Sequence, residues 1–77
     1  MIEKADLIPV FKAWYDYKME PANAELARLH RSTLEELRLK MEQINGGHPL
    51  DHGDLRHALW PRFGRWMIEN GLANPPR

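Results

Sequence analysis

One run of residues, 22–45, constrains the fold of this 77-residue chain more than any other feature. Its apolar side chains and one histidine recur at alternating steps of three and four residues, which places them on one face of an α-helix. Asn23 is a suitable N-cap for such a helix, and Asn45-Gly46-Gly47 is a clear stop because glycine adopts the left-handed conformation at low cost. The run therefore predicts a helix over 23–45 with a stripe of Ala27, His30, Leu34, Leu37, Met41 and Ile44.

Ser32-Thr33-Leu34-Glu35 introduces one ambiguity into this helix, because it matches a capping box. The helix could end near His30 and restart at Thr33. The stripe keeps its phase through this point, which favours a continuous helix. The spacing also fits the seam of a coiled coil, but it covers fewer than three full heptads. We expect the stripe to form the core, with a homodimer through another face as a further option.

Two shorter segments flank the long helix. Asp6 is expected to cap a helix over 6–18, in whose first turn Pro9 is tolerated because the first amides lack helical acceptors. Residues 52–70 form the other segment, which Asp51 is expected to cap.

Pro61 interrupts the segment 52–70. Proline donates no backbone hydrogen bond and crowds the preceding turn, so the pattern predicts a kink at this point or a break into two helices over 52–60 and 61–70. Asn70-Gly71-Leu72 is typical of a helix end with glycine in the left-handed position.

These patterns predict a small all-α protein. It would be a three-helix bundle with a long central helix, or a bundle of four short helices if the third segment breaks. Residues 1–72 would form a single helical domain, and 73–77 a disordered C-terminal tail. The expected interior comprises Leu7, Phe11, Trp14, Leu26, Leu34, Leu37, Met41, Ile44, Leu55, Leu59, Phe63 and Trp66.

The bulk composition excludes several classes of function. Eleven basic and eleven acidic residues leave no net charge, which counts against a phosphate-dominated interface with nucleic acid and against an anionic membrane. The absence of cysteine removes disulfides and cysteine-based zinc sites. The longest apolar run is far too short to span a bilayer, and no signal peptide is recognisable. We therefore expect a cytoplasmic protein.

Candidate sites for chemistry are weak. His48, Asp51 and His52 are close in sequence and of types that bind zinc, but Pro49 and the capping role of Asp51 favour ordinary loop residues. His30 is expected to be a packed histidine with one hydrogen bond. A three-helix chain of this size leaves little volume for a pocket of converging acids and bases. We therefore predict no catalytic residue, no metal and no cofactor, and hence not an enzyme.

Several aromatic, apolar and arginine side chains fall outside the predicted interior. Tryptophan, tyrosine and arginine are enriched at the energetic centres of protein interfaces. The chain is therefore predicted to be a non-catalytic module that binds another protein and modulates or occludes it, as small regulatory or inhibitor proteins do, including those encoded by phages and accessory genes. The predicted partner-binding residues are Tyr17, Leu39, Arg56, Trp60, Arg62, Arg65 and Ile68.

The alternative is a small helical DNA-binding regulator that uses Arg56, Arg62 and Arg65. On a helical projection Arg62 and Arg65 share one side and Arg56 falls on another, so the three do not make one face. This pattern and the zero net charge make nucleic acid the less favoured partner.

Overall fold

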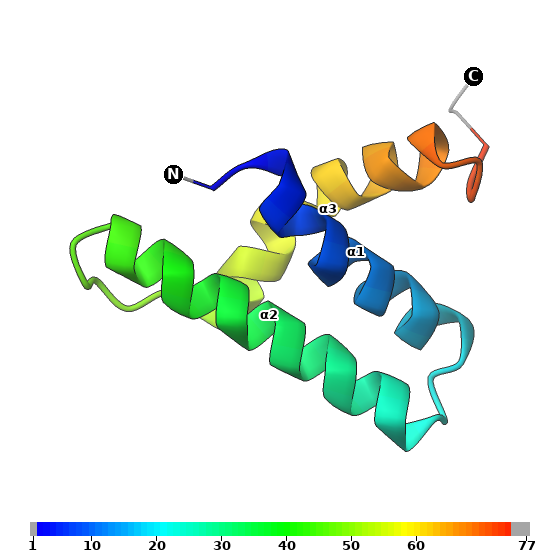
Figure 1. Ribbon diagram of the computed structural model, residues 1–77, viewed down its shortest axis with the longest axis horizontal. Helices are drawn as coiled ribbons and strands as arrows, with labels where there is room; N and C mark the ends of the chain where they lie inside the picture. Colours follow the sequence, from blue (N-terminus) through cyan, green and yellow to red (C-terminus); the bar gives the residue numbers. More distant parts are fainter. Residues whose placement is uncertain (1, 75–77) are drawn as a thin grey trace.

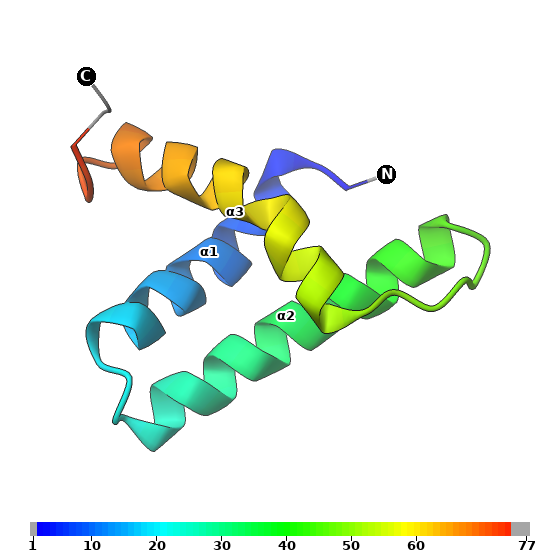
Figure 2. The ribbon, with the colours of Figure 1, turned by 180° about the vertical axis from the view of Figure 1, so that it is seen from behind.

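The computed structural model describes residues 2–74 and has three helices: α1 (Lys4–Met19), α2 (Ala24–Ile44) and α3 (His52–Glu69). The first two form an antiparallel hairpin (Figure 1). From behind, α3 starts against the C-terminal half of α2 and leads toward the N-terminal half of α1 (Figure 2). The predicted all-α fold of three helices is thus confirmed, and α2 is its longest element.

The long helix is continuous, as the phase of its stripe predicts. Asn23 caps it, because its side-chain oxygen accepts from the N–H groups of Glu25 and Leu26 at 3.0 and 3.3 Å. The Thr33 hydroxyl donates to backbone carbonyls within the helix instead of starting a new one. The alternative of a restart at Thr33 is therefore wrong. The predicted stop is confirmed, since Gly46 takes a φ of 73°.

The start of α1 differs from the prediction. Glu3 is the N-cap residue and Asp6 lies inside the first turn, so the expected cap at Asp6 is wrong. The Asp6 carboxylate accepts from the N–H of Glu3 at 2.8 Å and from Nζ of Lys40 at 2.7 Å. It therefore stabilises the helix start from within and also ties α1 to α2. With this start Pro9 lies beyond the first turn, where the carbonyl of Ala5 loses its usual helical donor.

The third helix is one element across Pro61. The predicted break into 52–60 and 61–70 is therefore wrong, and the kink stays a prediction. Asp51 caps the helix as expected, accepting from the N–H of Gly53 at 3.3 Å. The predicted end is also confirmed, because Gly71 has a φ of 70° and the N–H of Leu72 donates to the carbonyl of Met67 at 2.8 Å.

The predicted tail over 73–77 is described only in part. Ala73 and Asn74 are not helical, and residues 75–77 lie outside the described residues.

Side chains from all three helices form one core. Its buried apolar residues are Leu7, Val10, Phe11, Leu34, Leu37, Leu55, Leu59 and Phe63. Seven of the predicted interior residues are buried, and Trp14, Leu26, Met41 and Trp66 are half-buried. Val10 and Ala13, which the prediction omits, are buried as well.

Ile44 is the one predicted interior residue that is exposed. The ion pair between Lys40 and Asp6 marks where α2 passes the first turn of α1. Ile44 lies one helical turn beyond that point, where no turn of α1 remains to cover it. Its place in the interior is therefore wrong, because a stripe does not indicate where the partner helix ends.

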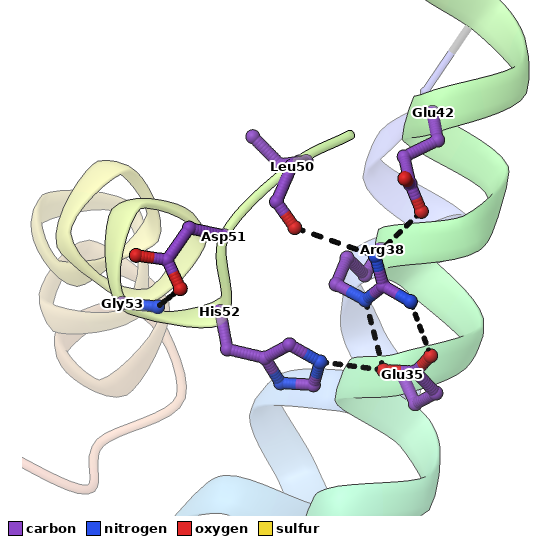
Figure 3. Close-up of polar contacts among 7 residues, drawn as sticks. All are labelled: Glu35, Arg38, Glu42, Leu50, Asp51, His52 and Gly53. Carbon is purple, nitrogen blue, oxygen red and sulfur yellow. Dashed lines mark hydrogen bonds and ion pairs between the residues drawn. The ribbon is translucent and has the colours of Figure 1, made fainter. Parts of the chain in front are cut away.

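A polar cluster around Arg38 fixes the connection between α2 and α3 (Figure 3). The Arg38 guanidinium contacts Glu35 at 2.5 Å and Glu42 at 2.6 Å, and it donates to the backbone carbonyl of Leu50 at 3.3 Å. Nε2 of His52 lies 2.6 Å from the same Glu35 carboxylate. Hydrogen bonds from Arg38, with a smaller contribution from His52, lower the pKa of Glu35 to about 2. The cluster therefore holds the first turn of α3 on α2.

Candidate partner-binding surfaces

A row of aromatic rings runs through the core and ends at two tryptophans. Phe63 lies at its centre, with Trp14 stacked at a centroid distance of 4.4 Å and Phe11 at 5.7 Å. At one end Trp60 packs against Trp14 at 5.8 Å, and at the other Trp66 stacks on Phe63 at 6.1 Å. The row connects two separate surfaces, one around Trp60 and the other around Trp66.

The first surface surrounds Trp60, which is 55% exposed. Nζ of Lys18 lies 5.7 Å from the centre of the Trp60 ring, within range of a cation–π interaction. Beneath it, the ring of Trp14 also contacts the imidazole of His30 at 5.7 Å. We define the Trp60 cluster as Trp14, Tyr17, Lys18, His30, Arg56 and Trp60, which come from all three helices.

His30 is the buried polar member of this cluster. Its imidazole is 3% exposed and stacks on Tyr17 at 5.0 Å with an interplanar angle of 6°. The expectation of a packed histidine is confirmed. The expected hydrogen bond is wrong for Nδ1, which is buried and has no partner in the described part of the chain. Burial lowers the pKa of His30 below its ordinary value, and the charges of Arg56 and Arg31 lower it further.

This pKa shift predicts that the fold loses stability in mild acid. Because the folded pKa of His30 lies below the ordinary value of 6.5, the unfolded chain binds more protons between the two values. The contribution of His30 to the free energy of unfolding should fall as the pH drops below about 6.5, and this contribution stops falling below the folded pKa of His30. Urea titrations followed by circular dichroism between pH 8 and pH 5 measure this slope.

Two histidine variants test the assignment of this slope. His30→Phe fills the space between the rings with a group that does not titrate, so it should flatten the dependence on pH. His48→Gln alters an exposed histidine and should leave the dependence unchanged. Equal slopes in the wild type and in His30→Phe would refute the assignment to His30.

The second surface is a groove between α1 and the C-terminal half of α3. Two adjoining hollows of about 340 and 520 Å³ make it up. Both are lined by Lys4, Ile8, Trp66 and Glu69. We call it the α1–α3 groove, and the further residues that matter to its chemistry are Phe11, Lys12, Arg62, Arg65 and Leu72.

The structure distributes the seven sequence-predicted residues over several places. Tyr17 and Trp60 both pack within the Trp60 cluster through His30 and Trp14. Arg56 lies one helical turn before Trp60 on α3, and its charge contributes to lowering the pKa of His30. Arg62 and Arg65 both line the α1–α3 groove. Leu39 is 48% exposed on α2 and Ile68 is half-buried on α3, and within residues 2–74 neither contributes to the Trp60 cluster or lines the groove. The seven predicted residues therefore do not form one continuous surface.

Neither a family model, a curated protein nor a solved structure matches this chain.

Sequence reasoning missed several residues of these surfaces. Lys18 escaped notice because it lies in the last turn of α1 and reaches Trp60 only through the tertiary fold. The spacing of four residues between Ile8 and Lys12 does predict that the two side chains share one face of α1. Their opposition to Trp66 depends on how α3 lies beside α1, which no local pattern encodes.

Residues 2–74 show neither a metal site nor a membrane-spanning helix. No three histidine or acidic side chains converge there as a metal site requires. Across the same residues, no helix combines the length and the apolar character that crossing a bilayer demands.

Proposed function

We propose that this protein is a non-catalytic module that binds another protein through the Trp60 cluster. The observation that carries the proposal is the position of Trp60, which is more than half exposed although the chain has a small core and would gain stability from burying it. Trp14 supports the ring from below and Lys18 lies over it. A preorganised tryptophan beside tyrosine and arginine is the usual composition of an interface hot spot.

The titratable groups support a role without catalysis. The pKa of Asp6 is lowered mainly by its hydrogen bond from Lys40, which ties α1 to α2. The pKa of Glu35 is lowered mainly by hydrogen bonds from Arg38 on the same helix, with a smaller contribution from His52 on α3. The lowered pKa of His30 arises from burial between aromatic rings. These three groups lie in different parts of the fold, whereas acid–base catalysis gathers such groups in one cleft.

In the proposed role the chain regulates its partner by occlusion, as a small inhibitor or regulatory protein does. A three-helix protein that covers a surface of its partner needs no chemistry of its own. We place it in the cytoplasm, which the absence of cysteine suits. The alternative role, a DNA-binding regulator, is less favoured because Arg56 lies in the Trp60 cluster while Arg62 and Arg65 lie in the groove.

Site-specific photocrosslinking in the producing cell tests the proposal. Benzoylphenylalanine at position 60 should yield covalent adducts with one protein, because an interface core excludes water around its central aromatic ring. The same group at position 39, an exposed site on α2 outside the cluster, should yield few. Against the captured partner, purified Trp60→Ala should bind at least about 10-fold more weakly than the wild type, whereas Leu39→Ala should bind as the wild type does.

Two outcomes would overturn the proposal. One is the absence of any protein adduct from position 60 when position 39 yields one. The other is tight, strongly salt-dependent binding of random duplex DNA by the purified chain, which would favour the DNA-binding alternative.

A further inference from the structure

The α1–α3 groove combines an apolar floor with basic walls, and it is separate from the Trp60 cluster. Buried Phe11 forms part of the floor, Trp66 is half-buried beside it, and Ile8 and Leu72 are exposed along the sides. Among the described residues, the groove and the cluster share no member. Burying an exposed apolar depression of this kind against a partner is favourable, because apolar surface is removed from water.

The charged side chains around the groove are predominantly basic. Lys12 comes from α1, and Arg62 and Arg65 come from α3. Within residues 2–74, none of these three makes an ion pair. Lys4 and Glu69 pair with each other at 3.4 Å, and both side chains are well exposed, so this contact is weak. The walls therefore present three cationic groups that pair with no carboxylate among the residues that the structure describes.

We propose that the α1–α3 groove binds an acidic amphipathic helix of another protein. The apolar stripe of such a helix would cover Ile8, Trp66 and Leu72, and carboxylates on its flanks would pair with Lys12, Arg62 and Arg65. From Lys4 to Lys12 the groove wall on α1 covers eight steps of helix, about 12 Å at 1.5 Å per residue. The bound contact therefore spans two to three turns of the guest helix.

The structure of the groove walls indicates which secondary structure the bound segment adopts. Both walls are helices, whose central backbone N–H and C=O groups are already paired within the helix. Within residues 2–74 no sheet edge is available to which an extended peptide could add as a strand, so recognition depends on side chains. A helix laid in a groove between helices meets this requirement.

The charge distribution decides against two other guests. In a symmetric dimer through this groove, Arg62 and Arg65 of one copy would face the same two arginines of the other copy. Repulsion between these like charges disfavours such a dimer. Nucleic acid would satisfy the arginines, but its phosphates would leave the apolar side chains of Ile8 and Leu72 without a partner. An acidic helix satisfies both the cations and the apolar floor.

Fluorescence anisotropy with three labelled 18-residue peptides tests the inference on the full chain. The first is an amphipathic helix with a leucine stripe flanked by glutamates, the second carries lysines in place of the glutamates, and the third is a scrambled version of the first. We expect the first peptide to bind at least about 10-fold more tightly than either of the others, and more weakly as salt is raised. Equal affinities, or no binding of the acidic helix at millimolar concentration, would overturn the inference.

Matched charge reversals locate the binding site. The double variant Arg62→Glu, Arg65→Glu should weaken binding of the acidic helix at least about 10-fold. The control Arg28→Glu, Arg31→Glu makes the same change in net charge on exposed positions of α2, and it should weaken binding far less. An equal loss in both would mean that bulk charge attracts the peptide, and the groove would not be its site.

Two further measurements complete the test. If the α3 variant fails to fold by circular dichroism, Ile8→Gln combined with Lys12→Glu alters the opposite wall at exposed positions and should show the same loss. Trp60→Ala should leave peptide binding unchanged, so a failure here is distinguishable from a failure of the proposed function at the Trp60 cluster. Tighter binding of random duplex DNA than of the acidic helix, or a dimer in sedimentation that the peptide does not dissociate, would also overturn the inference.

Discussion

Phe63→Ala should remove a large share of the folding stability of this chain. Phe63 is fully buried, with 0% of its surface exposed, and its ring contacts those of Phe11, Trp14, Trp60 and Trp66. Truncating a buried phenylalanine costs about 3–5 kcal/mol through lost transfer free energy and the cavity left behind. At roughly 0.05–0.15 kcal/mol per residue, a chain of this length has about 4–12 kcal/mol to lose.

Urea unfolding followed by circular dichroism measures this loss, and the near-ultraviolet signal of the tryptophans reports on the aromatic row. Phe63→Leu keeps most of the apolar volume and should cost markedly less than the alanine variant. A cost below about 1 kcal/mol for Phe63→Ala would contradict a central position for this ring, because a cavity in a packed core lowers the free energy of unfolding by more than that. It would mean that the row of rings collapses around the gap.

The second large effect concerns one face of α2. Leu34 is 0% exposed and Leu39 is 48% exposed, on the same helix and five residues apart. Leu34→Ala should lower the free energy of unfolding by about 2–5 kcal/mol. Leu39→Ala should change it by no more than about 0.5 kcal/mol, because a surface substitution away from caps and networks has little effect.

The same urea titration serves both variants, which makes the pair a direct measure of burial. Alanine has the higher helix propensity, so neither substitution harms the helix itself. Similar costs for the two leucines would contradict the orientation of α2. In that event the face of α2 that packs into the core would not be the face that contains Leu34.

The local signals of this sequence were strong because each has a direct physical cause. Asn23 and Asp51 cap their helices as predicted, since short polar side chains accept from free amides of a first turn. Gly46 and Gly71 end helices because they adopt positive φ without steric cost. The start of α1 was misplaced because Asp6 can accept from amides as a cap or from the Glu3 amide as a member of the first turn.

The candidate surfaces were predictable only in their parts. Tryptophan, tyrosine and arginine at positions off the stripe marked Tyr17, Arg56 and Trp60, which the structure brings around His30. The same reasoning grouped Leu39 with them, although a side chain that is exposed on α2 need not face the same way as one on α3. Exposure follows from the helical period, whereas membership of a surface depends on the packing angle between helices.

By itself, the sequence determined that this chain is all-α, where α2 and α3 are capped and stopped, and which face of each helix is apolar. Those features depend on backbone geometry and on contacts within a few residues, which a linear pattern records. Only the tertiary structure decided that α3 starts on α2 and leads toward the N-terminal half of α1. The same packing places Trp60 at one end of the aromatic row and the α1–α3 groove at the other. The approach of helices is set by how side chains distant in sequence fit together, and that fit exists only once the chain has folded.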